Sequence, residues 1–595
     1  MLVGLVATLA GCGGTSDSAP AVTAVPALGG TVTVGIDQAP TGCNPNTASG
    51  DTVANRLVLS LVLPSAFVVN EQGQAEADQA LIEQAELQST SPETVVYTIN
   101  PKAVWSDGVP ITATDFIYAW QHQRSVPLGE TGGDADVAST AGYDDISTMT
   151  PSNHDRTLKV VFSTPYADWR RLFENLLPAH VLDKTGWSPP CTNVDPSVDL
   201  SGGPYEITTV SRTKITLSRN PRWWGQQPRL ARIVVRVADS PVQLAHWMLR
   251  RKVNIAAPSF FGPTFLHDVT SMPSAKSAMN ISSTFLELEF SMIDQPTANA
   301  LVREGVAYSV DRQILVDRVA SWADVAIAPS TSHLYAQGQT GYPTVPAPVP
   351  ANSTTTTTVT STVPATTTTI AASTFPTDGD PVEEARALEA AGYQRDAVGS
   401  WVDFSGHALD LRLAVDSGDG WAAQAGALLA EQLRAQGIAI TTIDAPDAQS
   451  AGADLAGGRA DLALVPLRTT PYPTQASSWY TPLLDLPGST GAQDWSGYGS
   501  AKVENLFSQA AKTLNPVTAQ PIYDEIDQQL WADMVALPLF AEPTVLAWSA
   551  MISGVTPGPY WSGLFSTVLD WARLVNEPAS YTGTPRLPGA PRKGA

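Results

Sequence analysis

The chain has 595 residues, of which 43% are hydrophobic and 15% are charged, and its formal net charge is −23 at pH 7. This length exceeds what one hydrophobic core serves, so it indicates two to four domains. The acidic balance argues against a nucleic-acid-binding protein, because phosphate recognition needs a basic surface.

The N-terminus has the pattern of an exported lipoprotein. Residues 1–10 are apolar but too few to span a bilayer, which needs about 20 residues, so they predict the core of a signal peptide. The Leu-Ala-Gly run before Cys12 resembles a bacterial lipobox, in which the cysteine is acylated. We therefore expect a signal peptide over residues 1–12, lipidation at Cys12 and a small-residue tether over residues 13–28. The alternative is an ordinary buried strand that ends in Cys12.

Periodic patterns predict the elements of the first half of the chain. Residues 29–37 alternate as a strand, and residues 54–70 predict a helix that runs into a strand. Residues 157–182 predict a strand followed by an amphipathic helix. Residues 202–225 predict a β-hairpin, and residues 298–319 predict a helix with one apolar face.

The composition changes sharply in the second half. Residues 344–375 are rich in Thr and Pro and have no apolar periodicity, which predicts a disordered insert. A short helix is expected over residues 381–393. Residues 408–444 predict strand, helix and strand, which is a βαβ unit and therefore part of an α/β lobe. A buried strand follows at residues 461–467, and residues 501–540 predict two helices and a short strand.

The chain has three cysteines. If Cys12 is lipidated, Cys43 and Cys191 remain, and outside the cytoplasm two such residues either form a disulfide or stay as buried thiols. The sequence has no Cys/His spacing typical of a metal site, so we expect no metal and no cofactor.

Motifs for catalysis are missing. We find no P-loop, no GxSxG, no HExxH and no GxGxxG that opens a helix. Glu287 and Glu289 lie on one face of a predicted strand and are the candidates for an acid/base pair, but such a pair is far more often a solvent-exposed strand face. We therefore expect no enzyme activity and no catalytic residue.

One stretch, YTINPKAVWSDGVPITATDFIYAWQ at residues 97–121, combines a strand, a turn and a capped helix. Gly108 suits the turn because glycine adopts positive φ without strain. Thr112 is a good N-cap, and Asp115 three residues later completes a box-like cap that favours the positive end of the helix dipole. These features are structural and not catalytic.

The same stretch resembles the W-S-D-G-x-P-x-T-A-x-D signature of the family 5 solute-binding proteins of ABC importers, the dipeptide-, oligopeptide- and nickel-binding group. Three further blocks follow in the order of that family. They are Gly203-Pro204-Tyr205 with Arg219-Asn220-Pro221 and Trp224-Gly225; Val302-Arg303 with Ala307-Tyr308 and Asp311-Arg312; and Ala391-Gly392-Tyr393 with Gln436-Gly437-Ile438. The resemblance covers residues 29 to 570.

The resemblance implies an α/β fold, a two-lobed periplasmic-binding-protein clamshell (type II, cluster C) with an extra domain in the first lobe. The expected division follows the order of the matched blocks. Lobe I takes residues 29–48, 203–283 and 546–595, the extra domain takes 49–202, and lobe II takes 284–545 with the insert.

The family implies that a ligand is held in the cleft between the lobes. Ser49 and Gly50 match the loop that enters the extra domain and would face the ligand. The family segment after the strand at residues 461–467 often holds an Asp for the α-amino group of a peptide. Here it has no carboxylate and offers Arg468, with Tyr472 and Trp479 as flat faces for stacking.

An arginine suits a carboxylate or a phosphate, so we expect weak binding of short peptides that have free amino termini. The alternative is that another acid, such as Asp416 or Asp419, supplies the counter-charge. Asn254 also replaces the usual Asp of the G-E-x-D motif in this family.

The resemblance implies a monomeric, extracytoplasmic receptor, anchored by lipid to the outer face of the cell membrane. It would capture a peptide-like or other medium-sized solute and deliver it to the permease of an ABC importer. The alternative is a non-transport envelope lipoprotein of the same fold, as in an actinobacterial subgroup, that binds a glycolipid or a membrane enzyme. A third interpretation, an extracytoplasmic hydrolase, needs an acid/base pair that the sequence does not show.

Overall fold

The computed structural model describes residues 24–70, 73–125, 136–293, 296–343, 379–481, 494–556 and 563–576. The expectations for the signal peptide, for Cys12, for most of the tether and for the insert lie outside these ranges. Within them, no helix combines the length and the apolar composition needed to cross a bilayer.

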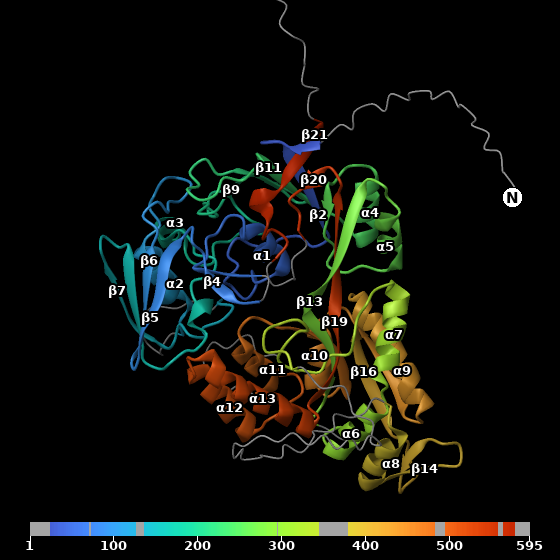
Figure 1. Cartoon of the computed structure of the whole chain (residues 1–595). Coiled ribbons are helices and arrows are strands. Elements are labelled where there is room, and N and C mark those ends of the chain that lie inside the picture. Colours follow the sequence, from blue (N-terminus) through green and yellow to red (C-terminus); the bar gives the residue numbers. More distant parts are fainter. Residues whose placement is uncertain are drawn as a thin grey trace, which may run out of the picture.

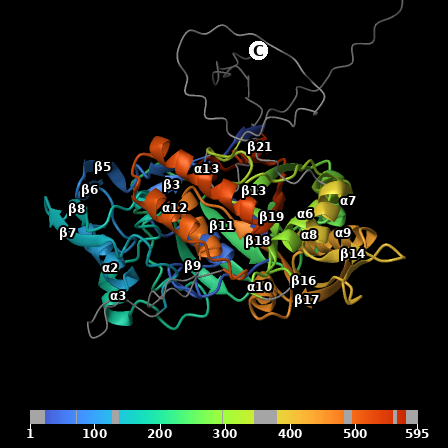
Figure 2. The same cartoon turned by 90° about the horizontal axis from the view of Figure 1, so that it is seen from below.

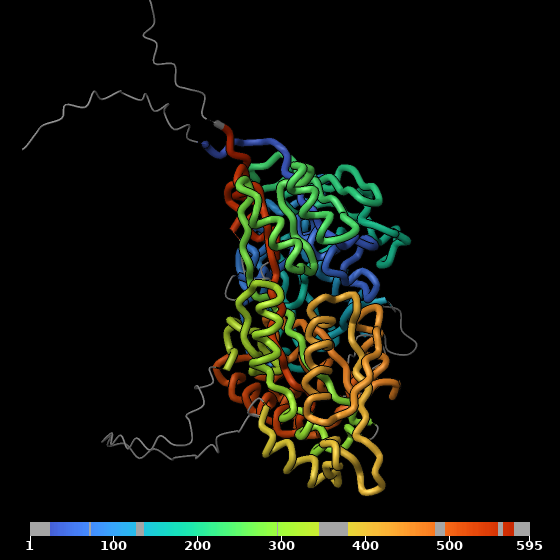
Figure 3. The backbone as a smooth tube through the Cα atoms, turned by 90° about the vertical axis from the view of Figure 1, so that its right-hand side faces the viewer, coloured from blue at the N-terminus to red at the C-terminus, as the bar shows by residue number. Residues whose placement is uncertain are grey.

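A ten-stranded sheet runs through both lobes (Figure 1). Its order is β17 (Ala439–Ala445), β16 (Asp410–Asp416), β18 (Leu462–Arg468), β13 (Ala275–Phe290), β19 (Ala536–Ser549), β12 (Ile255–Ala256), β2 (Thr31–Ile36), β11 (Arg232–Val237), β10 (Lys214–Arg219) and β9 (Tyr205–Ser211). Strands β13 and β19 are long enough to serve both lobes, which lie one above the other along them in Figure 3.

Lobe I is built around β2, β9 to β12 and three helices, α1 (Val53–Leu59), α4 (Pro241–Leu249) and α5 (Pro263–Thr270). The expected hairpin is present as β9 and β10. A small sheet joins β1 (Ala24–Pro26), β21 (Ala572–Asn576) and β20 (Ile552–Ser553). Residues 24–26 were expected to belong to the tether, but they form β1, which pairs with β21 and so fixes the start of the described chain to lobe I.

The extra domain packs around a four-stranded antiparallel sheet, with helix α2 against it. The sheet order is β5 (Ile82–Thr90), β6 (Glu93–Ile99), β8 (Thr157–Phe162) and β7 (Ile146–Ser152); β3 (Phe67–Val69) pairs with β4 (Ala75–Ala77), and the helices are α2 (Ala113–Gln123) and α3 (Ala179–Thr185). The expected cap of α2 is confirmed, because the backbone N–H of Thr112 donates to Asp115 Oδ2 at 2.9 Å and Thr112 caps the first turn.

The prediction of a helix directly after β8 is wrong. The chain instead forms a short 3-10 turn, η1 (Trp169–Arg171), then an extended stretch, and only then α3. Phe173 and Asn175 adopt left-handed backbone conformations, with φ of 64° and 48°, which interrupts helical geometry. The apolar pattern that suggested a helix is explained by burial, because Leu172, Phe173 and Leu176 all enter the extra-domain core.

Lobe II is the larger α/β body. Its helices are α6 (Ala300–Tyr308), α7 (Arg312–Ala323), α8 (Pro381–Ala390), α9 (Gly420–Ala435), α10 (Ala448–Ala456), α11 (Ser477–Tyr480), α12 (Ala501–Lys512) and α13 (Pro516–Asp533), with a hairpin of β14 (Tyr393–Arg395) and β15 (Trp401–Asp403). The expected βαβ unit is confirmed as β16, α9 and β17, whose strands are parallel. The single helix expected over residues 298–319 is two helices, because Asp311 caps a new one by accepting from the N–H of Ile314.

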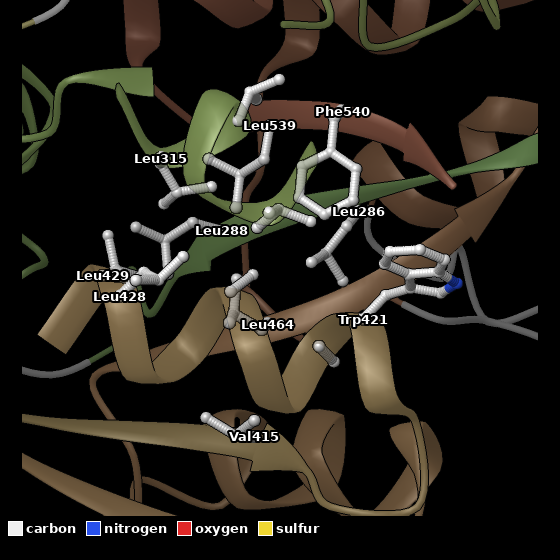
Figure 4. Packing of buried hydrophobic residues seen from close by; sticks show 14 of the residues in the cluster. Leu286, Leu288, Leu315, Val415, Trp421, Leu428, Leu429, Leu464, Leu539 and Phe540 are labelled. Carbon is white, nitrogen blue, oxygen red and sulfur yellow. The ribbon is translucent and has the colours of Figure 1, made fainter. Parts of the chain in front are cut away.

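Two layers of helices cover the sheet of lobe II. Figure 2 shows β13, β18 and β19 between α12 and α13 on one side and α9 on the other. In Figure 4, Trp421, Leu428 and Leu429 of α9 pack toward Leu286 and Leu464 of the sheet. Burying each such side chain contributes roughly 1.5–3 kcal/mol, so this packing holds α9, and with it the segment that leads into it, at a fixed position.

Candidate functional site

The parallel strands of the two lobes direct their carboxyl ends at the same boundary. In lobe I, β2 is parallel to β11 and β12, and β12 is antiparallel to β19. In lobe II, β16, β17 and β18 share one direction, and β18 is antiparallel to β13. Because β13 and β19 are themselves antiparallel and cross both lobes, the two sets of carboxyl ends face each other. Ligands of open α/β sheets bind outside these ends, so the boundary is the candidate site.

The two crossing strands provide a place to bend at this boundary. Their pairing extends from Ala275 with Ser549 to Glu289 with Ala536, and its register breaks between Ile281 and Phe285. An interrupted ladder bends more easily than a continuous one, and hinges are formed by a few residues at such positions.

The lobe II edge carries the residues predicted after β18. Arg468 ends the strand opposite Thr284, next to the break, and its side chain is exposed. Trp479 is half-buried against the lobe II core. Tyr472 is only 8% exposed, and the extra-domain residues Arg170 and Glu174 interact with it electrostatically. Tyr472 therefore lies between two parts of the protein and does not present an open face for stacking.

Ser49 and Gly50 lie on the loop that connects lobe I to the extra domain. The Ser49 hydroxyl is exposed and donates to Asp136 Oδ2 at 3.2 Å. Gly50 is buried, and a Cβ atom there would lie 2.0 Å from the carbonyl oxygen of Asn44. Gly50 is thus required for the tight path of the loop. Both residues lie where the lobe I loop meets the extra domain.

A small cavity of about 40 Å³ adjoins this loop. Arg56 forms an ion pair with Asp51 there, and its Nη1 lies 3.7 Å from Glu174 Oε2. Both partners and Arg171 line the cavity, together with Pro45, Asn46, Gln123, Ala138, Ser139, Ala141, Tyr143 and Leu172. A space of this size accommodates a few water molecules and not a peptide, and all of its lining residues belong to lobe I or the extra domain, so the cavity lies between these two parts and is not the solute site.

The extra domain touches lobe II directly. The backbone N–H of Ala167 donates to the carbonyl of Ala511 at 2.7 Å, and the Thr474 hydroxyl donates to Asp168 Oδ2. Burial raises the pKa of Asp168 to about 6. These contacts close the boundary beside Tyr472, so the extra domain forms one wall of the candidate site.

A second contact between the lobes joins lobe I to the start of α9. The ring of Phe260, in the loop between β12 and α5, packs edge-on against Trp421 with centroids 5.5 Å apart. A Cβ atom on Gly420 would lie 2.0 Å from the Phe260 ring. Next to Phe260, the Ser259 N–H donates to Asp37 at 2.9 Å, at the carboxyl end of β2. Lobe I and lobe II thus touch at Gly420, and the contact is possible because glycine has no side chain.

Three carboxyl groups lie at this part of the boundary. Asp416 ends β16 and accepts the N–H of Gly418 at 2.8 Å, and Asp419 caps α9 by accepting the N–H of Trp421 at 2.8 Å. Glu542 lies on β19 opposite the register break, and its carboxyl is hydrogen-bonded to that of Asp419. Burial and the charge of Asp419 raise the pKa of Glu542 well above its usual range.

Sequence reasoning named Asp416 and Asp419 only as an alternative and missed Glu542 and Phe260. The DSGDG run after a strand was the available signal for the first two, because it places acids at a strand end. Nothing local marks the other two, since they reach the boundary through the pairing of distant strands. In the described ranges, no group of three or more His, Cys, Asp or Glu residues is arranged to hold a metal ion.

The interpretation of Glu287 and Glu289 as a solvent-exposed strand face is wrong. Their side chains are 0% and 2% exposed, because α11 to α13 cover that side of β13. Glu287 accepts the Tyr480 hydroxyl at 3.0 Å, whereas neither carboxyl oxygen of Glu289 has a hydrogen-bond partner. Both residues lie inside lobe II, where a solute cannot reach them, so they form no acid/base pair for catalysis.

We expect Glu289→Gln to flatten the pH dependence of stability. Burial and the nearby Glu287 raise the pKa of Glu289 well above its usual range. A carboxyl with a raised folded-state pKa favours the folded state while it is protonated, and this stability is lost as the pH rises above the unfolded pKa near 4.3. The variant should therefore be more stable than the parent at pH 8, by about 1–3 kcal/mol, and the gain should shrink toward pH 5. Urea unfolding across this range measures it.

The matched control is Glu83→Gln, which removes an exposed carboxyl from β5. It should leave the pH profile unchanged. Equal effects of the two substitutions would show that burial does not control the titration of Glu289.

The structure joins Cys43 and Cys191 in a disulfide, with Cα atoms 5.8 Å apart. Cys43 lies in the lobe I loop before the Ser49 segment, and Cys191 follows α3. Both contact the lobe I core, so the bond ties the end of the extra domain to lobe I.

Comparison with known proteins agrees with this architecture. Residues 77–487 match the family described as bacterial extracellular solute-binding proteins, family 5 middle. The oligopeptide-binding protein OppA of Mycobacterium tuberculosis is 25% identical over 533 residues, which is 87% of this chain and 81% of that protein. The probable monoacyl phosphatidylinositol tetramannoside-binding protein LpqW of Mycobacterium tuberculosis is 26% identical over 421 residues, or 69% and 64% of the two chains.

Among solved structures, the periplasmic EDTA-binding protein EppA superposes with a TM-score of 0.79 at 25% identity, covering 93% of this chain and 98% of that one. The α/β clamshell expected from the sequence is therefore confirmed. The family binds solutes and does not consist of enzymes. With a family match over more than half of its length and two lobes that oppose their strand ends, the chain belongs to the family 5 bacterial extracellular solute-binding proteins.

Proposed function

We propose that this protein is a lipid-anchored receptor outside the cytoplasm that captures a peptide-like or other medium-sized solute and delivers it to the permease of an ABC importer. The observation that supports this most is the pair of opposed strand ends, joined by two strands whose pairing is interrupted at the boundary. That arrangement lets the lobes separate to admit a solute and then close around it. We propose that it acts as a monomer.

The charges at the lobe II edge support a particular solute chemistry. Asp416 and Asp419 already accept backbone N–H groups, and Glu542 is hydrogen-bonded to Asp419. Arg468 is the exposed charged side chain that ends β18 at the same boundary. We propose that the end of the solute that meets Arg468 is anionic, blocked or glycan-like, because a guanidinium suits a carboxylate or phosphate, whereas an ammonium beside Arg468 would meet a like charge.

Calorimetry with di- to pentapeptides tests this chemistry. Each peptide is titrated with a free and with an acetylated amino terminus. We expect weak binding of the free peptides. Submicromolar binding that disappears on acetylation would overturn the proposed solute chemistry and indicate an ordinary peptide receptor.

The similarity to LpqW supports a second candidate, a non-transport envelope lipoprotein that binds a glycolipid or a membrane enzyme. The two candidates differ in their genetic context and in their partners. Genes for a permease and an ATPase beside this one would favour the importer. Co-purification with a membrane enzyme and no permease would favour the second candidate.

We expect Cys12→Ala to release the protein from the membrane. Two or three acyl chains on Cys12 would give a stable membrane anchor, and the substitution removes the acceptor. Fractionation of cells into membrane and medium, with mass spectrometry of the N-terminus, measures this. A full-length variant that stays in the membrane fraction with an unchanged mass would show that the lipobox interpretation is wrong.

A further inference from the structure

Basic residues are concentrated in one part of this acidic chain. Residues 212–252 contain ten of its 34 Lys and Arg residues but only one acid, Asp239, although the formal net charge of the whole chain is −23. Such segregation is not needed for folding, and it creates a local potential opposite to that of the rest of the surface.

The fold gathers many of these cations, and two from elsewhere, at one end of lobe I. This end lies at the amino ends of β2, β11 and β12, away from the solute boundary. Seven exposed side chains lie there, which we call the basic end: Arg229, Arg232, Arg250, Arg251, Lys252, Lys276 and Arg573.

Backbone hydrogen bonds connect the loops of the basic end. The Gly29 N–H donates to the Arg229 carbonyl at 2.7 Å, and the Ala27 N–H donates to the Arg573 carbonyl at 2.9 Å. The Ser549 N–H donates to the Asn254 carbonyl at 2.8 Å, and the Ala550 N–H donates to the Ser274 carbonyl at 2.8 Å. The loops therefore form one continuous surface, close to β20 and β21 in Figure 1.

None of the seven side chains forms an ion pair within the described part of the protein, whereas Arg residues elsewhere, such as Arg318 with Glu431, do. Three acids border the same end, Glu206, Asp268 and Asp570, and Asp570 accepts from Gln226 at 3.1 Å. The cations outnumber these acids by four. Exposed cations without internal ion-pair partners are available to an external anionic surface.

The chain enters lobe I at this same end. The start of the described chain, β1, pairs with β21 beside Arg573. The eleven residues between Cys12 and Ala24 allow these two residues to lie at most roughly 40 Å apart when the chain is fully extended. An acyl chain on Cys12, as we propose above, would therefore keep the basic end near the membrane surface.

We infer that the basic end of lobe I docks on the anionic headgroups of the membrane that holds the protein. Each Lys or Arg near such a surface strengthens binding by about fivefold, and the effect falls off within a Debye length. Docking in this way orients the basic end of lobe I toward the lipid. The boundary between the lobes, which is the candidate solute site, then lies away from the membrane surface.

Vesicle sedimentation of the full chain carrying Cys12→Ala tests this inference independently of the lipid anchor. The probes are protein-free vesicles of phosphatidylcholine alone and of phosphatidylcholine with about one-third phosphatidylglycerol, at about 20 mM and about 300 mM salt. We expect binding only to the anionic vesicles and only at low salt.

A charge-matched pair of variants locates the surface. Arg250→Gln, Lys252→Gln and Lys276→Gln together should weaken binding by on the order of a hundredfold. The control variant removes three exposed cations of the extra domain, by Lys102→Gln, Lys159→Gln and Lys184→Gln. It should change vesicle binding less than twofold. If the triple variant of the basic end unfolds, Arg250→Gln and Lys276→Gln are measured singly, with a loss of about fivefold each.

Three outcomes would overturn the inference. They are the absence of binding to anionic vesicles at low salt, equal losses in the two triple variants, and binding to native membrane vesicles but not to protein-free ones. The last outcome would assign the basic end to an acidic membrane protein.

Discussion

Gly420→Ala should weaken solute binding by about 10- to 100-fold and leave the protein folded. A Cβ atom at this position would lie 2.0 Å from the ring of Phe260, which belongs to the other lobe. Overpacking of this kind costs about 1–3 kcal/mol. Rotation about the hinge relieves the clash and also weakens the neighbouring contact of Phe261 with Trp421, whose ring centroids lie 5.2 Å apart. The cost therefore falls on the closed arrangement that holds the solute. Small-angle scattering should show a larger radius of gyration, and calorimetry or native mass spectrometry should show the loss of binding.

Two further variants make this prediction specific. Gly262→Ala is the matched control, because a Cβ atom there has no neighbour closer than 3.9 Å. Adding Phe260→Ala to Gly420→Ala should restore closure, since it removes the ring that the new methyl group meets. Unchanged affinity in Gly420→Ala would show that the Phe260 contact does not belong to the solute-binding arrangement.

Replacing Cys43 and Cys191 together by alanine should lower the free energy of unfolding by about 2–5 kcal/mol. The disulfide links residues 148 apart in the sequence, and a long closed loop restricts the unfolded chain strongly. Urea unfolding measures the difference, and the parent protein in a reducing agent should approach the variant. Identical midpoints for oxidised parent, reduced parent and variant would show that the bond does not stabilise the fold.

Local patterns predicted the elements whose packing is decided by nearby residues. The βαβ unit around α9 and the capping box of α2 were expected because strand alternation, helix periodicity and caps are all encoded within a few residues. Reliance on local periodicity also explains the wrong prediction of a helix after β8. Its apolar spacing fits a helix, but Phe173 and Asn175 take left-handed conformations while their neighbours fill the extra-domain core.

Tertiary contacts account for what the sequence could not show. Glu287 and Glu289 alternate with apolar residues as an exposed face would, and only the helices packed over β13 bury them. Tyr472 is enclosed because the extra domain reaches lobe II through Asp168 and Thr474. Glu542 and Phe260 join the boundary through strand pairings between segments hundreds of residues apart.

The predicted roles of Ser49, Gly50, Arg468 and Trp479 remain predictions. The structure places Ser49 and Gly50 where lobe I meets the extra domain, and Arg468 and Trp479 on lobe II. A solute that contacts both groups must lie across the boundary. Alanine at Ser49 and at Arg468 should therefore weaken the binding of the same solute.

Native mass spectrometry of the protein isolated from the cells that make it tests the central claim most directly. We predict that the parent protein carries a noncovalent solute between its lobes, that Gly262→Ala retains this solute, and that Gly420→Ala loses it. If Gly420→Ala retains the same solute as fully as the parent, solute binding does not depend on closure of the two lobes, and a site between the opposed strand ends is contradicted.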